Sequence, residues 1–391
     1  YDMKQFLFIL LSLVMVNAMS QSYDRLNNSN TEESSKKLMM GGYAQIEYRQ
    51  PLINGEFNNG KLDVHRMVLL MAYRFNNKIS FMSEIEVEHA SEIYLEQAYL
   101  NYRFKNWLQL RAGLMLIPMG IINENHEPPT FNGVIRPSLD KYIVPTTWRE
   151  IGIGFTGNII EASMNYSLYV INGVVSYNDG ATLNGKYGIR KGRQKGISSI
   201  IGSPNFAGRV EYYGVKSLNL GLSGYYGETQ STLNKGISVD DQFAIDIRDS
   251  TIVNMGMLGI DARYDISGFR FRVQYNYASF SNTEAYNTYT GSDLGSSMMG
   301  YYIEAAYDVF HTFSNISHEL IPFVRYENYN TQHSVDASMK KNDAYHSEEI
   351  TAGLGWKPIS NVALKADYQM IRPKTESTFT GIVSLGVGLM F

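Results

Sequence analysis

The sequence contains no cysteine among its 391 residues, so we expect neither a disulfide bond nor a lipid anchor on a cysteine thiol. It has no run of about 18 consecutive apolar residues, the length that a membrane-spanning helix needs. The formal net charge of −4 is small, which argues against a nucleic-acid partner. The seven histidines are scattered, and none lies in a metalloprotease helix motif or a nucleophile elbow. We therefore expect no enzymatic activity and no cofactor.

What the sequence does contain is a long series of segments in which apolar and polar residues alternate. Such alternation is typical of β-strands, because successive side chains point to opposite faces of a sheet. In one segment Phe269 and Phe271 share a face, while Arg270 and Arg272 share the other. The predicted strands are 40–50, 62–75, 78–89, 93–104, 107–118, 149–158, 160–172, 205–214, 218–229, 251–265, 268–281, 297–309, 319–330, 347–357, 360–371 and 379–391. An all-β protein with one apolar and one polar face is indicated.

The connections between these segments alternate in length. Tight turns such as Asn76-Asn77 and Ser267-Gly268 alternate with long polar links. The long links are 51–61, 119–148, 173–204, 230–250, 282–296 and 331–346. Membrane barrels have short turns at one end and long loops at the other, whereas a soluble β-sandwich has no reason to sort its loops in this way. We predict a transmembrane antiparallel β-barrel of about 16 strands with a wet interior.

The two ends of the chain indicate export to a bacterial outer membrane. Met3 and Lys4 precede a short apolar run and then small residues up to Ser20, the features of a signal peptide. We predict a signal peptide over 1–20, a flexible periplasmic tail over 21–39 and the outer-membrane β-barrel over 40–391. Large apolar residues fall on alternate positions of the last strand and end on Phe391. Phe391 is the predicted assembly signal for the barrel-assembly machinery.

Two stretches within residues 92–157 carry a specific pattern. The first contains EQAYLNY from Glu96, LRAG from Leu110 and IPMG from Ile117, and the second is WREIGIGFTG from Trp148. Both resemble the phosphate-selective porin O/P family. The resemblance implies a sixteen-stranded trimeric porin whose long third external loop, here 119–148, folds into the pore. It implies pore architecture better than a preference for phosphate.

By strand parity, charged residues of both signs point to the barrel interior. Guanidinium groups fit phosphate oxygens two at a time, so arginines there can favour anions. Carboxylates on the same face, Glu161 among them, nearly balance these charges, and the alternative is a wall of cross-strand ion pairs. We prefer Arg66 and Arg111, because Arg111 lies in the strand that leads into the third loop. The predicted pore-lining residues are Arg66, Arg74, Arg111, Arg209, Arg263, Arg272, Arg325, Lys365, Glu84 and Glu86.

Two of the long links carry further candidate residues. Link 173–204 has a basic run that either attracts anions or lipopolysaccharide phosphates, or is a solvated flexible loop. The basic run consists of Lys186, Arg190, Lys191, Arg193 and Lys195. The predicted constriction loop, 119–148, contains Glu124, His126, Glu127 and Arg136, and its two prolines are expected to rigidify it. Carboxylates beside a histidine can bind a metal, but no second ligand cluster follows at metal spacing, so we expect no metal.

The predicted function is passive diffusion of small hydrophilic solutes through an outer-membrane porin, with a modest preference for anions such as phosphate. The predicted partners are the lipid bilayer, lipopolysaccharide, the solutes and two further copies in a homotrimer. The main alternative is a non-conducting barrel that serves as a structural subunit of a larger outer-membrane assembly. A TonB-dependent transporter would need a plug domain and a larger barrel, for which this chain has no room. Nothing in the sequence indicates the catalytic triad of an outer-membrane phospholipase or protease.

Overall fold

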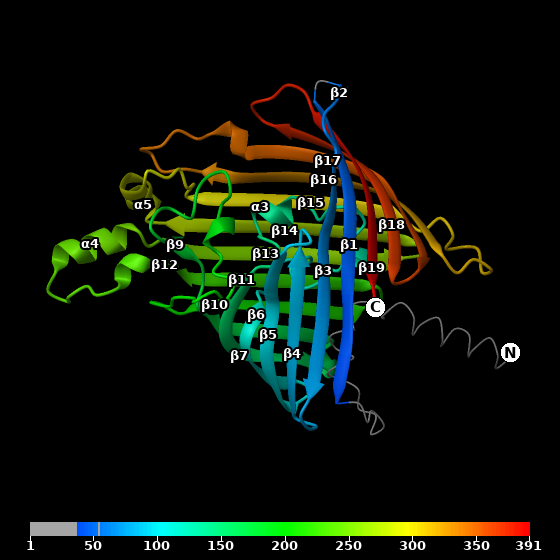
Figure 1. Ribbon diagram of the computed structural model, residues 1–391, viewed down its shortest axis with the longest axis horizontal. Helices are drawn as coiled ribbons and strands as arrows, with labels where there is room; N and C mark the ends of the chain where they lie inside the picture. The colour runs from blue at the N-terminus through cyan, green and yellow to red at the C-terminus, as the bar shows by residue number, and fades with distance from the viewer. Residues whose placement is uncertain (1–36, 54) are drawn as a thin grey trace.

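The protein is a closed antiparallel β-barrel of sixteen strands in the computed structural model, which describes residues 37–53 and 55–391 (Figure 1). The predicted signal peptide and most of the predicted tail lie outside the described residues. The first strand, β1 (Leu38–Ile53), pairs with β3 (Lys61–Arg74) on one side and with β19 (Thr380–Met390) on the other. This pairing closes the ring, so the sheet has no open edge for lipid to cover.

The predicted strands are confirmed, with shifts of a few residues at their ends. Besides the three strands of the closure, the barrel contains β4 (Ile79–Glu88), β5 (Glu92–Lys105), β6 (Leu108–Leu116), β7 (Arg149–Ile159), β8 (Met164–Ile171), β10 (Asn205–Val215), β11 (Leu218–Glu228), β13 (Asn254–Ile266), β14 (Phe269–Ser281), β15 (Ser297–Tyr307), β16 (Glu319–Ser334), β17 (His346–Ile359) and β18 (Val362–Pro373). One start was wrong: β8 begins at Met164 because a 3-10 turn, η2 (Ile160–Ala162), precedes it. Glu161 therefore lies exposed in a turn and does not face the interior.

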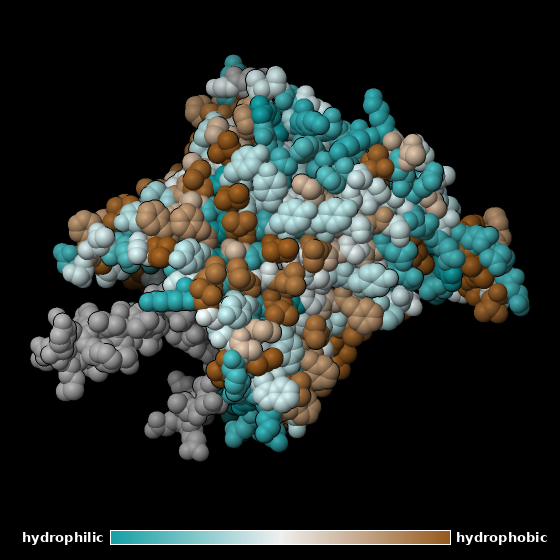
Figure 2. All heavy atoms as spheres, turned by 180° about the vertical axis from the view of Figure 1, so that it is seen from behind, coloured by the Kyte–Doolittle hydropathy of each residue, from teal (hydrophilic) through white to brown (hydrophobic). Residues whose placement is uncertain are grey.

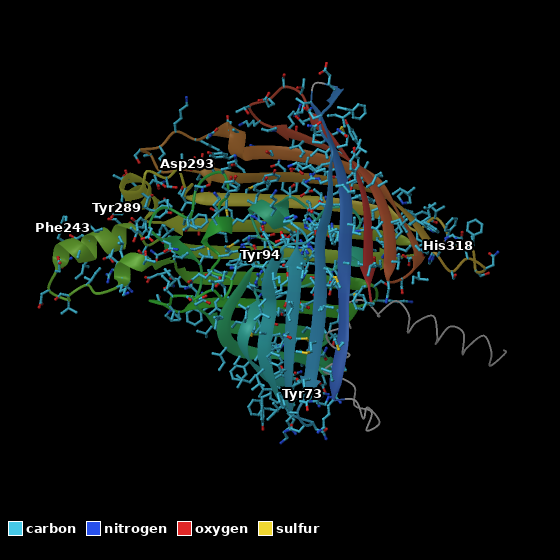
Figure 3. All side chains as sticks on the ribbon, in the orientation of Figure 1. Tyr73, Tyr94, Phe243, Tyr289, Asp293 and His318 are labelled. Carbon is cyan, nitrogen blue, oxygen red and sulfur yellow. The ribbon has the colours of Figure 1, made fainter. Side chains whose placement is uncertain are left out.

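The connections give the barrel two different ends. We call the end with the tight turns, such as 267–268 and 360–361, the short-turn end, and the opposite end the long-loop end. Figure 3 shows Phe243 and Tyr289 projecting at the long-loop end and His318 at the other. The long loops add the helices α4 (Gln242–Ser250) and α5 (Thr283–Thr290), the parallel pair β9 (Val175–Tyr177) and β12 (Gln230–Ser231), and the short β2 (Glu56–Phe57). None of the helices in the described residues has the length and apolar composition that crossing a bilayer takes.

The two faces of the wall differ as the alternation predicts. On β14, Phe269 and Phe271 are exposed on the outer face, while Gln274 and Asn276 are fully buried inside. Apolar and weakly polar residues cover much of the outer wall in the space-filling view (Figure 2). In a bilayer, such an outer face meets lipid, so these exposed apolar side chains need no protein partner.

The interior is occupied by the long link between β6 and β7. It contains a 3-10 turn, η1 (Pro128–Thr130), and the short helix α3 (Leu139–Tyr142), which lies within the ring of strands in Figure 1. Apolar residues of this link, including Ile122 and Leu139, form one cluster with wall residues such as Tyr225. The hydrophobic core of the protein thus lies inside the barrel, where this loop meets the wall.

Candidate functional site

The constriction loop, residues 119–148, is packed into the barrel rather than suspended across it. Met119, Leu139, Ile143 and Trp148 are all fully buried. The Trp148 indole lies 4.9 Å, between ring centroids, from Tyr225 of β11. Because such burial of large side chains stabilises a single packing arrangement, the loop is a fixed part of the interior.

Polar anchors hold the same loop from the wall. The Lys365 ammonium of β18 donates to the carbonyls of Pro128, Phe131 and Gly133 at 2.6, 2.5 and 2.9 Å. The backbone N–H of Val134 donates to Asp367 at 2.6 Å. Lys365 and Asp367 both lie on β18, near the C-terminal end of the chain. The loop is therefore bound by residues more than two hundred positions away in the sequence.

Further anchors lie on β14 and β16. Arg272 donates to the carbonyl of Thr130 at 2.7 Å, and Gln274 donates to Asp140 of α3 at 2.9 Å. The backbone N–H of Leu139, at the start of α3, donates to Glu327 at 3.1 Å. The loop is therefore bound to several strands of the ring, and its position limits the width of any solute path through the barrel interior.

The terminal strand β19 makes room for the loop. A Cβ added to Gly388 would lie 2.4 Å from the Pro128 Cβ, and one added to Gly386 would lie 2.8 Å from Val134. Real Cβ atoms are not found at such distances, so the close approach of β19 to the loop requires glycine at both positions. The small residues of the predicted assembly strand thus have a second role inside the barrel.

His126 of the loop forms a buried cluster with the wall. Its Nε2 lies 3.4 Å from Glu96 of β5, which also accepts a hydrogen bond from the Tyr43 hydroxyl at 3.1 Å. Burial lowers the pKa of His126, but the charge and hydrogen bond of Glu96 outweigh it and raise the pKa above its usual value. The arrangement is a buried ion pair that ties the loop to β5. Arg136 of the same loop donates to the carbonyl of His126 at 3.0 Å.

Sequence reasoning missed Glu96 because a β-bulge turns it inward. Gln97 pairs with Glu84 and Leu95 pairs with Ile85, which leaves Glu96 as an extra residue in β5. Both Glu96 and Gln97 are consequently buried on the inner face. The signal was present in the sequence: the outward residues Leu95 and Leu100 are five positions apart, an odd number that simple alternation does not allow.

Most predicted pore-lining arginines lie inside in ion pairs with the wall. Arg209 binds Asp261 through two hydrogen bonds of 2.6 and 2.8 Å. The other pairs join Arg263 with Glu211 at 2.8 Å, Arg325 with Glu304 at 3.2 Å and with Glu327 at 2.8 Å, and Arg66 with Glu86 at 3.2 Å. Glu84 accepts a hydrogen bond from Gln97 at 2.9 Å. Arg74 lines a narrow cavity at the short-turn end with Met82 and Asn101. The inner charges are thus arranged as a network that largely neutralises itself.

Arg111 differs from these arginines. Its guanidinium lies 5.1 Å from the centroid of the Tyr99 ring and donates to the Tyr169 hydroxyl at 3.3 Å. Among the described residues, it has no carboxylate within 4 Å. Aromatic groups of the wall stabilise its charge, and Glu124 of the constriction loop acts on it from beyond ion-pair distance. Glu124 and Glu127 are partly buried, and the loss of hydration raises the pKa of both.

The basic run of loop 173–204 packs partly onto the constriction loop. Arg193 donates to the carbonyl of Thr146, and Lys195 lies over the Tyr94 ring at 5.0 Å. Lys186 and Lys191 lie 5.4 and 4.4 Å from the centroid of the Tyr187 ring and are exposed, whereas Arg190 is half-buried in the turn η3 (Arg190–Gly192). Two exposed ammonium groups therefore remain at the long-loop end.

Comparison with solved structures gives the same architecture. The protein is similar to the outer-membrane channel DcaP of Acinetobacter baumannii (9% identity, TM-score 0.57, 90% of this chain and 97% of that chain). It is also similar to the anion-selective porin from Comamonas acidovorans (12%, 0.56, 90% and 99%) and to Salmonella typhi OmpF in complex with daunomycin (11%, 0.58, 90% and 97%). At this identity, the likeness shows the fold of an outer-membrane β-barrel.

Sequence comparison adds the family. An uncharacterized protein of Aquifex aeolicus (strain VF5) is 31% identical over 359 residues, which cover 87% of this chain and 77% of that protein. Residues 39–381 match the family described as phosphate-selective porin O and P, so the match extends from the first strand to the last. The chain therefore belongs to the phosphate-selective porin O and P family of bacterial outer-membrane channels.

Proposed function

We propose that the protein is a passive channel for small hydrophilic solutes with a modest preference for anions such as phosphate. The observation that carries the proposal is Arg111, a partly buried guanidinium on the inner wall without an ion-pair partner among the described residues. The paired arginines around it present little net charge to a solute. An anion that reaches Arg111 gains a charge-assisted contact, whereas a cation is repelled there. The similarity to an anion-selective porin supports the same direction.

The preference is modest because a single charge in a wet lumen acts weakly. A unit charge about 4 Å from a hydrated anion contributes about 1 kcal/mol, which is at most about a fivefold change in the permeability ratio. The exposed Lys186 and Lys191 add to the local anion concentration at the long-loop end. Their effect fades with salt, because the Debye length falls from about 10 Å at 0.1 M to about 3 Å at 1 M.

The test is a planar-bilayer recording of the purified protein in a salt gradient. We expect the wild type to conduct, with a reversal potential that shows a preference for anions. Arg111→Ala should move the reversal potential toward zero, and the matched control Arg111→Lys should retain most of the anion preference. Equal reversal potentials for the wild type and Arg111→Ala would remove Arg111 from the proposal.

A structural subunit without conductance is the second candidate. It is favoured by one observation, the tight packing of the constriction loop, whose Leu139, Ile143 and Trp148 are fully buried inside the ring. A wild-type protein that folds and inserts but remains electrically silent would decide for this candidate. Homotrimer formation and contacts with lipopolysaccharide and the assembly machinery stay predictions, and sedimentation of the purified protein in detergent tests the trimer.

A further inference from the structure

A second group of polar residues lies at the long-loop end, between β3 and the link that joins β4 to β5. The Asp63 carboxylate accepts a contact of 2.6 Å from His89 Nδ1 and lies 3.8 Å from His65 Nδ1. Glu47 of β1 lies 3.5 Å from the same His65 atom. Two imidazoles and the Asp63 carboxylate therefore lie within 4.8 Å of one another, and Glu47 lies beside His65. Neither the constriction-loop anchors nor the proposed anion path uses them.

A β-bulge places His65 in this group. Asp63 pairs with Glu47 and Arg66 pairs with Gln45, so Val64 and His65 together face one residue of β1. The bulge turns His65 inward beside Arg66, where regular alternation would have pointed it outward. The outer residues Val64 and Met67 are three positions apart, which is the trace of the bulge in the sequence.

The backbone conformation also places His89 beside Asp63 and His65. His89 and Ala90 both have left-handed backbone conformations, with φ of 52° and 56°. Such conformations are uncommon for residues other than glycine and occur where the surrounding structure enforces them. The His89 N–H donates to the carbonyl of His65 at 3.2 Å, which fixes the two histidines side by side, with ring centroids 5.6 Å apart.

We propose that Asp63, His65 and His89 form a binding site for a divalent transition-metal ion such as Zn²⁺ at the mouth of the barrel. A tetrahedral Zn²⁺ with bonds of about 2.0–2.2 Å holds its ligand atoms about 3.4 Å apart. The distance of 3.8 Å between His65 and Asp63 is close to this spacing, and the 2.6 Å contact between His89 and Asp63 has only to lengthen. Imidazole and carboxylate are ligands that suit this class of metal.

The site is open to solvent. The side chains of His65, Asp63 and His89 are 24%, 31% and 47% exposed, so an ion can enter from the long-loop end. Two further carboxylates, Glu88 and Glu92, flank the link that carries His89. The group of Glu84, Glu96 and His126 is less suited to a cation, because it is fully buried and both Arg66 and Arg136 act on Glu96.

Metal binding at His65 has a consequence for Arg66. At present Arg66 Nη2 lies 2.7 Å from His65 Nε2 and donates to it. With the metal on Nδ1, a neutral imidazole carries its proton on Nε2, so two donors would face each other. Arg66 then moves toward Glu86 and Glu88, which already lie 3.2 and 4.0 Å from its guanidinium. The site therefore couples metal binding to a charged side chain of the barrel interior.

The experiment measures Zn²⁺ binding to the folded protein in detergent micelles by isothermal titration calorimetry. Co²⁺ then serves as a spectroscopic probe, because histidine ligation in a tetrahedral site gives visible absorption. The wild type binds one Zn²⁺ per chain, and His65→Ala and His89→Ala each weaken the binding by at least about tenfold. The matched control is His333→Ala, an exposed histidine at the same end of the barrel, which leaves binding unchanged.

Heat-modifiable migration in gel electrophoresis verifies that each variant is folded, so a loss of binding is assigned to the lost ligand. Asp63→Asn gives an independent variant that retains both histidines. Wild-type protein without stoichiometric Zn²⁺ binding, or His65→Ala and His89→Ala that bind like His333→Ala, would overturn the proposal. Because no conductance is measured, this outcome is independent of the channel function.

Discussion

At the residue scale, Lys365 is the most heavily used contact between the wall and the constriction loop. Its ammonium has three carbonyl acceptors and lies 3.9 Å from the centroid of the Phe131 ring. Three backbone carbonyls that cannot reach water are thus satisfied by one side chain. A charge buried in this way is retained because its removal leaves all of its partners unpaired.

Replacing Lys365 with methionine should loosen the loop without changing the fold of the wall. Each buried acceptor left without a donor costs about 1–3 kcal/mol, so we expect a loss of about 3 kcal/mol in the free energy of unfolding. Urea unfolding followed by tryptophan fluorescence measures this loss, and channel recordings should show a larger conductance. The control is Lys357→Met, whose ammonium lies 4.0 Å from Glu319 of the wall. Equal stability of the two variants would contradict the anchoring role.

Strand parity correctly predicts that Arg209 and Arg325 lie on the inner face, but it does not predict their partners. The partner of a side chain depends on the register between strands and on which loop fills the interior. Arg209 meets Asp261 across β11, a strand that contributes Gly221 at the crossing point. Arg209 and Asp261 are 52 positions apart, and no pattern in the sequence links them. The predicted pore-lining set therefore contains both network residues and Arg111, and parity cannot separate them.

At the element scale, several groups of the constriction loop, among them Asp140 and His126, bind protons more tightly when the loop is seated. Burial raises the pKa of Asp140 in α3 to about 8, from an ordinary value of 3.8. The pKa of His126 is raised through Glu96, although burial opposes it. A raised folded-state pKa gives stability that is complete below the ordinary pKa and is lost as the pH rises through the folded value. Both groups therefore favour the seated loop at low pH.

We expect the loop to be less firmly seated at pH 9 than at pH 6. The contribution of Asp140 is lost between about pH 4 and about pH 8, and the loss for His126 begins near its ordinary value of about 6.5. Single-channel conductance or open-channel noise should rise over this range. Asp140→Asn should remove part of the rise, whereas Glu376→Gln, an exposed carboxylate in the last long-loop-end connection, should leave it intact. Identical pH profiles for the wild type and Asp140→Asn would refute this role of Asp140.

The strands were predictable because each one shows the two-residue period of a wall between lipid and a polar interior. The elements that were missed, α3, α4, α5 and the pair β9 and β12, all lie in the long links. Their packing partners are distant in the sequence, since α3 lies against β15 and β16 and α4 lies against α5, so no local period marks them. The two β-bulges, in β3 and β5, were only partly predictable. The odd spacing of the outward residues around each bulge is visible in the sequence, but a prediction that assumes regular alternation does not detect it.

At the scale of the whole molecule, the barrel depends on the seam between β1 and β19. The Phe391 N–H donates to the carbonyl of Gly42 at 2.9 Å, and the Gly42 N–H donates back to Phe391 at the same distance. The Phe391 ring is exposed on the outer face. The residue thus finishes the ladder of the closing pair and adds an apolar group to the lipid-facing surface.

Phe391→Asp should reduce the amount of folded barrel in outer-membrane fractions. The carboxylate places a charge on the lipid-facing side of the seam, where its transfer from water is unfavourable. Heat-modifiable migration and protease protection in membrane fractions measure the folded amount, with Phe391→Tyr as the control that retains the aromatic ring. Normal assembly of Phe391→Asp would show that Phe391 is not the assembly signal.

The position of η1 couples the filling of the interior to the closure of the barrel. This turn of the constriction loop contacts β1, β18 and β19, the strands that meet where the ring closes. Gly386 and Gly388 face it so closely that the loop and the last strand occupy complementary shapes. A loop still outside the ring when β19 reaches β1 would leave Lys365 and Asp367 without the backbone groups they bind. The last strand therefore closes over the loop as well as against β1, and the packing of the interior and the completeness of the wall depend on each other.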